Sequence, residues 1–193
     1  ISRRLLTTVR LEKKMAVNFI DQFWVKAAPT TKAKGFKLMY NQADRYKIDL
    51  NLLHEAGVRF IHLIRKNLLK KYVSGELLRI HKTAHTTCTI DQKTLYIDTD
   101  GMLKTLKKMN DNIRRYQELL ADKNCLDITY ESFFQNQEGH ASRILQFLNI
   151  SGQESMHCDL RKMTADDLSS VITNWEEVVE ALSPTEFAHF LRL

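Results

Sequence analysis

Three short apolar runs, each followed by a segment with helical periodicity, constrain the fold of this chain more than any other feature. The runs cover residues 35–40 (GFKLMY), 58–64 (VRFIHLI) and 125–130 (CLDITY). Their length and their β-branched and aromatic side chains are typical of buried strands. Strands that alternate with helices pair in a mostly parallel sheet, because each connection carries the chain back across one face. We therefore predict an α/β fold with these three strands in one sheet.

The segments between and after the strands predict helices. Residues 100–120 place apolar side chains at intervals of three and four, which is the pattern of a long amphipathic helix. Asn67 can cap another helix that begins after the second run. The side chains expected on the inward face of that helix are Leu69, Tyr72, Val73, Leu77 and Ile80. Residues 183–186 (SPTE) form a capping-box pattern that predicts a last helix, with Phe187, Phe190 and Leu191 facing inward.

Length and composition fit one globular domain over residues 1–193. No apolar stretch approaches the roughly 20 residues that a membrane helix needs, so we expect a soluble protein. The three cysteines, Cys88, Cys125 and Cys158, are widely separated, which favours neither disulfides nor a zinc site. We therefore expect no metal and a cytoplasmic location.

The positive charge of the chain is concentrated in residues 59–82. This segment holds seven basic residues and one acidic residue, whereas the rest of the chain sums to zero. The basic residues are Arg59, Arg65, Lys66, Lys70, Lys71, Arg79 and Lys82. Such a localised excess favours an anion site over a broad nucleic-acid surface. The alternative is a solvated helix face that aids solubility.

Arg65 stands at the carboxyl end of a predicted strand, where open α/β sheets bind ligands. At about 100° per residue, Asn67, Lys70, Lys71 and Ser74 share one side of the following helix. A guanidinium, a serine hydroxyl and the free N–H groups of a helix start would suit a phosphate. The sequence therefore predicts a phosphate site built around Arg65 and Ser74.

This segment resembles the 3′-phosphate-binding signature of the sulfotransferase superfamily. Residues 65–69 (RKNLL), with Ser74 nine positions after Arg65, are similar to the branch that includes bacterial Nod-factor and trehalose sulfotransferases and plant relatives. The resemblance implies that Arg65 and Ser74 bind the 3′-phosphate of 3′-phosphoadenosine-5′-phosphosulfate. It also implies sulfuryl transfer to a hydroxyl or amine on a small-molecule or glycan acceptor.

The likeness extends over about residues 35–193. Further segments resemble the family in the same order, namely residues 35–42 (GFKLMYNQ), 126–131 (LDITYE), 144–148 (ILQFL) and the closing stretch 168–187. They imply a P-loop-like three-layer fold. By position in the family, Arg161 and Lys162 reach the donor, although a surface pair beside a helix start at Thr164 is the alternative.

The family's Gly/Ser/Thr-rich phosphosulfate loop is not visible in residues 1–35. The chain therefore resembles a sulfotransferase domain that lacks its N-terminal strand and this loop, and we expect it to bind the spent donor and transfer little sulfate. We assign no catalytic base. His62 is expected in the core, and Tyr130 with Glu131 is expected to be a structural pair.

Two other functions stay open. The first is a non-catalytic nucleotide-binding or scaffolding relative that has lost the loop. The second is a basic adaptor for RNA or DNA, which is disfavoured because the only aromatics in the basic segment, Phe60 and Tyr72, fit the core pattern and leave no stacking platform. We expect no nucleic-acid partner.

Overall fold

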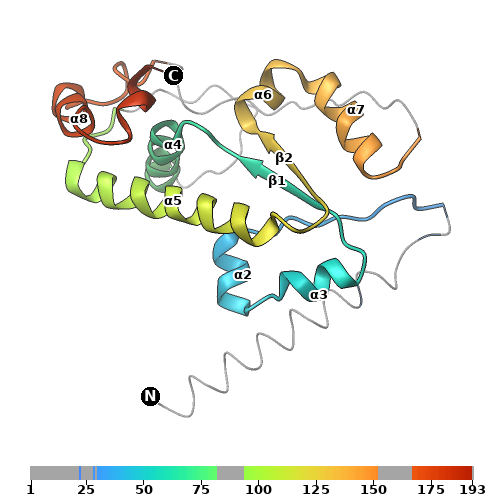
Figure 1. Ribbon diagram of the computed structural model, residues 1–193. Helices are drawn as coiled ribbons and strands as arrows, with labels where there is room; N and C mark the ends of the chain where they lie inside the picture. Colours follow the sequence, from blue (N-terminus) through green and yellow to red (C-terminus); the bar gives the residue numbers. More distant parts are fainter. Residues whose placement is uncertain (1–21, 23–27, 29, 82–93, 152–166, 193) are drawn as a thin grey trace, which may run out of the picture. The chain divides into compact units, whose positions relative to one another are not determined.

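A computed structural model of the chain describes residues 22, 28, 30–81, 94–151 and 167–192. It is a mixed α/β structure, mostly helical, with a two-stranded parallel sheet flanked by helices (Figure 1). The strands are β1 (Phe60–Ile64) and β2 (Cys125–Thr129). The α/β class and two of the three predicted strands are thus confirmed. None of the described helices combines the length and apolarity that crossing a membrane requires.

The chain divides into two compact units. The first is made of Ile1–His62, Tyr116–Leu126 and Gly139–Glu154, and the second of Leu63–Arg115, Asp127–Glu138 and Ser155–Leu193.

Helices α2 (Tyr40–Tyr46) and α3 (Leu50–Glu55) belong to the first unit, as does most of α7 (Gln137–Phe147). The backbone N–H of Met39 donates to the Gln42 side chain at 2.9 Å, which fixes the start of α2. The Asp49 carboxylate caps α3 by accepting from the Asn51 N–H at 2.9 Å. These polar side chains explain why the chain forms two short helices here.

The predicted strand at residues 35–40 is wrong. Residues 31–39 have no regular secondary structure, and Tyr40 already belongs to α2. The alternation that suggested a strand is nevertheless present, because Phe36 and Leu38 are half-buried while Lys37 is exposed. The segment is apolar on one side, but no described strand pairs with its backbone.

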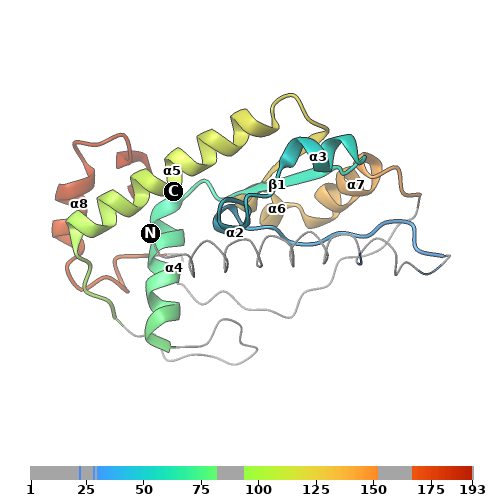
Figure 2. The ribbon, with the colours of Figure 1, turned by 90° about the horizontal axis from the view of Figure 1, so that it is seen from below.

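The second unit is helical and encloses the larger core. Its elements are α4 (Leu68–His81), most of α5 (Thr99–Leu120), α6 (Tyr130–Gln135), α8 (Trp175–Leu182) and the 3-10 helix η1 (Ala188–Arg192). Helix α4 lies next to α5 and runs at a steep angle to it in both views (Figures 1 and 2). Their buried faces contribute Leu69, Val73, Met102 and Leu106, which are fully excluded from solvent. The first residues of α4 therefore pack directly against this core.

The helix predicted after Asn67 and the helix predicted at residues 100–120 are confirmed over the described residues, with corrections of detail. Leu69, Val73 and Leu77 are buried as expected, but Ile80 is 45% exposed near the end of α4. The capping box predicted at residues 183–186 does not form. Instead the Thr185 hydroxyl donates to the carbonyl of Leu182 at 2.8 Å, so it closes a turn after α8 and only the short η1 follows.

Candidate functional site

The candidate site lies in the second unit, where β1 ends and α4 begins. Arg65 is the first residue after β1, and Tyr130 is the first residue after β2. Because the strands are parallel neighbours, their carboxyl ends share one edge of the sheet. The Arg65 guanidinium carbon lies 4.8 Å from the centre of the Tyr130 ring. This cation–π contact covers one face of the planar guanidinium. Its N–H groups lie in the plane of the guanidinium, so the contact does not use them as donors.

Asn67 fixes the start of α4. Its side-chain oxygen accepts from the Lys70 N–H at 2.8 Å, so the predicted cap is confirmed. Its side-chain nitrogen donates to the carbonyl of Phe190 at 3.1 Å, and the residue is only 2% exposed. The prediction that Asn67 shares the polar face of α4 is therefore wrong, because both ends of its amide are used inside the protein.

Glu131 holds the turn between β1 and α4. Its carboxylate accepts from the N–H of Lys66 at 3.0 Å and from the N–H of Asn67 at 3.1 Å. The expected structural role of Glu131 is thus confirmed. Of the N–H groups at the helix start, those of Lys66, Asn67 and Lys70 have acceptors within the protein, so they are not available to a ligand as predicted.

Two cations stand close together at this turn. Burial lowers the pKa of Lys71, and the positive charge of Arg65 lowers the pKa of Lys71 further. Within the described ranges, no carboxylate forms an ion pair with either residue. Arg79, further along α4, differs in this respect because it pairs with Glu76 at 3.3 Å. Two cations without an ion-paired carboxylate among the described residues favour a bound anion.

A cavity of about 280 Å³ adjoins the turn and is lined in part by Arg65 and Lys66. Its other charged wall is Arg114 of α5, whose guanidinium pairs with the Glu186 carboxylate at 2.9 Å. The cavity wall is therefore positively charged on the side of Arg65, whereas the charge of Arg114 on the other side is neutralised by Glu186. Ser74 is half-buried on α4 and does not line this cavity.

The other predicted site residues are placed as follows. Arg161 and Lys162, together with Thr164, lie outside the described residues. His62, in the first unit, is 6% exposed and hydrogen-bonded to the Tyr40 hydroxyl, so the prediction of a core histidine is confirmed.

Two participants were missed by the sequence reasoning, the ring of Tyr130 under Arg65 and the Arg114 wall of the cavity. Tyr130 was singled out only as half of a structural pair. Arg114 is an exposed residue of α5, outside the apolar face of this helix. Nothing in the local sequence distinguishes it from the other charged residues of the helix.

No protein-family model matches this chain, and no curated protein or solved structure matches it either. A function is therefore inferred from the geometry at the end of β1 and from the sequence resemblance.

Proposed function

We propose that this chain binds the 3′-phosphate of 3′-phosphoadenosine-5′-phosphosulfate and serves a sulfuryl transfer to a hydroxyl or amine acceptor. The observation that carries the proposal is the placement of Arg65, which lies 4.8 Å from the centre of the Tyr130 ring, lines a cavity and has no ion-paired carboxylate among the described residues. Lys71, whose pKa is lowered by burial and by the charge of Arg65, completes a pair of cations. The resemblance of residues 65–74 to the 3′-phosphate signature supports the same ligand.

A phosphate suits this pair for three physical reasons. A dianion relieves the repulsion between Arg65 and Lys71, and it restores the charged form of Lys71 that burial disfavours. The Arg65 fork offers paired donors that match two phosphate oxygens. The Tyr130 ring and the Glu131 carboxylate hold the turn in place, so little ordering is left to occur on binding.

In the proposed reaction, an acceptor oxygen or nitrogen attacks the sulfur of the donor and loses its proton to a base. The bond between sulfur and the bridging oxygen breaks, and adenosine 3′,5′-bisphosphate leaves with the charge on its 5′-phosphate. Arg65, Lys71 and Ser74 are proposed to hold the nucleotide end, and Arg161 with Lys162 is proposed to contribute from outside the described residues. Groups that stabilise the leaving phosphate are a separate requirement.

The two other functional classes make different demands on this site. A non-catalytic relative would bind the nucleotide equally well, so only a transfer assay separates it from an enzyme. A nucleic-acid adaptor needs exposed aromatic platforms. The aromatic residue of α4, Tyr72, is partly buried and packs against the core, which disfavours this alternative.

The test of the binding proposal is calorimetry with adenosine 3′,5′-bisphosphate and with adenosine 5′-monophosphate, which lacks the 3′-phosphate. The bisphosphate should bind more tightly, and Arg65→Ala should remove most of the difference, about 1.5–3 kcal/mol for hydrogen bonds to a charged group. Arg79→Ala is the matched control, because Arg79 lies on the same helix and pairs with Glu76. Equal affinities for the two nucleotides, or equal losses in the two variants, would contradict the proposal.

The test of the transfer proposal is a labelled-sulfate assay with a panel of hydroxyl and amine acceptors. Residues 1–193 alone should transfer little sulfate, because their sequence offers no Gly/Ser/Thr-rich loop for the sulfuryl end. A chain extended by such a loop should be active and should lose activity with Arg65→Ala. Nucleotide binding without transfer by the extended chain would favour the non-catalytic alternative.

A further inference from the structure

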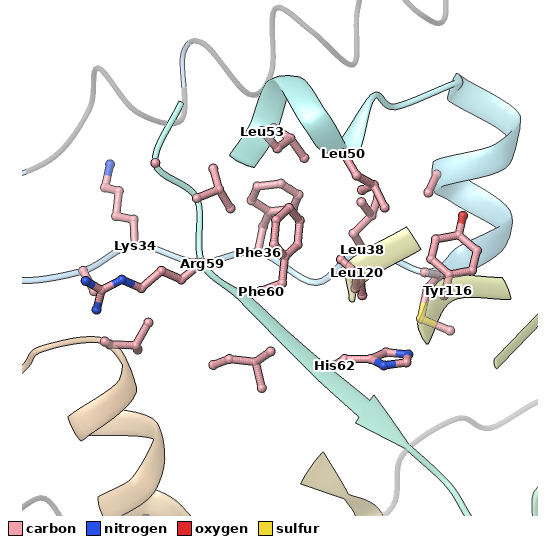
Figure 3. A pocket seen from close by; sticks show the side chains of 18 of the residues that line it. Lys34, Phe36, Leu38, Leu50, Leu53, Arg59, Phe60, His62, Tyr116 and Leu120 are labelled. Atoms are coloured by element: carbon pink, nitrogen blue, oxygen red, sulfur yellow. The ribbon is translucent and has the colours of Figure 1, made fainter. Parts of the chain in front are cut away.

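A second cavity lies in the first unit, and it differs in character from the cavity near Arg65. It has a volume of about 490 Å³, within the range of sites for small organic molecules (Figure 3). Its middle is apolar, with the rings of Phe36 and Phe60 next to each other in Figure 3. The aliphatic side chains around them are those of Leu38, Leu50, Leu53, Leu120 and Leu148.

The polar end of this cavity is cationic. Arg59 and Lys34 lie on the same side of the two phenylalanine rings (Figure 3). The Arg59 guanidinium donates to the carbonyl of Phe147, and its Nη2 reaches the amide oxygen of Asn149 at 2.9 Å when that amide is turned to accept. Both acceptors are neutral, and within the described part of the chain no carboxylate pairs with Arg59. The charge of Arg59 is thus oriented but not neutralised.

The opposite end offers ring faces instead of charge. The Tyr40 and Tyr116 rings are stacked with their centres 4.2 Å apart. The Tyr116 hydroxyl donates to the Asp44 carboxylate at 2.9 Å, and the Tyr40 hydroxyl is hydrogen-bonded to His62. Since these polar atoms already have partners within the protein, a ligand meets mainly the flat sides of the rings. The cavity therefore has cationic side chains at the end with Arg59 and Lys34 and aromatic rings at the end with Tyr40 and Tyr116.

We propose that this cavity binds an apolar monocarboxylate, with its carboxylate at Arg59 and its hydrocarbon or aromatic body between Phe36 and Phe60. An apolar body gains free energy from leaving water in proportion to the area buried. The carboxylate fits the remaining N–H donors of a guanidinium that neutral carbonyls hold in place. This site is independent of the proposed nucleotide site, and neither proposal depends on the other.

The test compares 1-naphthaleneacetate with its neutral amide, 1-naphthaleneacetamide, by calorimetry on the intact chain. The two probes share the same aromatic body, so their difference reports the charged contact alone. The acid should bind about tenfold more tightly than the amide, since a charge-assisted hydrogen bond is worth about that factor. Equal affinities would overturn the assignment of the carboxylate to Arg59, and no binding of either probe would overturn the site itself.

Two variants and one control locate the site. Arg59→Gln should bring the acid down to the affinity of the amide, and Ala43→Leu, which adds volume to a buried lining residue, should weaken both probes. Lys37→Gln removes the same charge from an exposed neighbour of Phe36 that does not line the cavity, so it should leave both affinities unchanged. A loss with Lys37→Gln as large as that with Arg59→Gln would show a general charge effect and refute the proposal.

Because Arg59 also supports the end of α7, a folding defect in Arg59→Gln must be distinguished from a loss of ligand contact. Thermal unfolding of each variant without ligand detects such a defect. If Arg59→Gln is unfolded, the acid-to-amide ratio of the unmodified chain and its response to Ala43→Leu still decide the proposal. A ratio near one, or an unchanged affinity in Ala43→Leu, would refute it.

Discussion

Arg59 and Arg65 stand just before and just after β1, and the structure uses them in different ways. Arg59 lines an apolar cavity of the first unit and donates to the backbone carbonyl of Phe147. Arg65, in the second unit, lies over the Tyr130 ring with the cation of Lys71 nearby. The first arginine is a single charge beside an apolar surface, whereas the second belongs to a pair of like charges.

This difference separates the two kinds of anion that we propose for the chain. A single oriented guanidinium next to aromatic rings favours a monoanion with an apolar body. Two adjacent cations favour a compact ligand of higher charge, such as a phosphate. Position along the sequence does not reveal this, because both residues are arginines that flank the same strand.

The largest effect on stability is expected from Asn67→Ala, which removes hydrogen bonds that hold the turn after Arg65. The change removes the cap on the Lys70 N–H and the bond to the Phe190 carbonyl at a buried position. The free energy of unfolding should fall by about 2–3 kcal/mol, the sum of a cap and a buried hydrogen bond. Urea denaturation measures it. A fall below about 0.5 kcal/mol would show that the amide does not hold the turn.

A crosswise binding experiment sharpens the comparison of the two arginines. Arg65→Gln should weaken adenosine 3′,5′-bisphosphate about tenfold and leave 1-naphthaleneacetate unaffected, and Arg59→Gln should do the reverse. Calorimetry of both ligands with both variants gives the four values. If either variant weakened both ligands equally, the two residues would not define separate sites.

In the first unit, Tyr116→Phe should reduce stability by about 1 kcal/mol, the usual contribution of one hydrogen bond. The hydroxyl that is lost donates to the Asp44 carboxylate at 2.9 Å, while the ring stack on Tyr40 is retained. Thermal unfolding should detect the change without altered nucleotide affinity. An unchanged melting temperature would mean that water replaces the hydroxyl without loss.

The smallest effect is expected from Lys71→Met, because Lys71 remains partly in contact with water. Its lowered pKa means that the unfolded chain binds more protons than the folded protein between the lowered value and the ordinary value of 10.5. Stability should therefore rise with pH across that window, and the penalty is fully present below it. At neutral pH, Lys71→Met should be more stable than the unmodified chain.

The difference between Lys71→Met and the unmodified chain should close as the pH approaches 10.5, the ordinary lysine value. Lys70→Met is the matched control, because Lys70 is also half-buried on α4. Denaturation at several pH values measures both variants. Parallel pH profiles for the two variants would indicate a general gain in hydrophobicity instead of relief of charge.

Local patterns in the sequence were sufficient to predict β1, β2, α4 and α5. Each of these elements has a strong period and contributes to a buried face, as Leu69 and Leu106 do in the second unit. Residues 35–40, by contrast, were predicted as a strand from their local pattern and do not form one. Phe36 and Leu38 alternate with exposed neighbours as in a strand, but a strand also needs a partner backbone. Pairing depends on distant residues and cannot be read from the run itself.

The candidate site shows the same division. Arg65 and the cap at Asn67 were predictable, because an arginine at a strand end and an asparagine before a helix have local meanings. The contacts that occupy the N–H groups of the turn come from Glu131, and the second bond of Asn67 goes to Phe190. Such long-range partners decide which donors remain for a ligand, and no local pattern specifies them.

The partners of Asn67 also determine when the turn after Arg65 can form its contacts during synthesis of the chain. Glu131 follows Asn67 by 64 positions, and Phe190 follows it by 123. The turn that carries Arg65 is therefore synthesised long before Glu131 and Phe190, the residues that form hydrogen bonds with it. Contacts of such high sequence separation are slow to form. A nascent chain that is stalled before Phe190 should lack the contact that holds the turn with Arg65, so the proposed nucleotide affinity should develop only when translation has passed this residue.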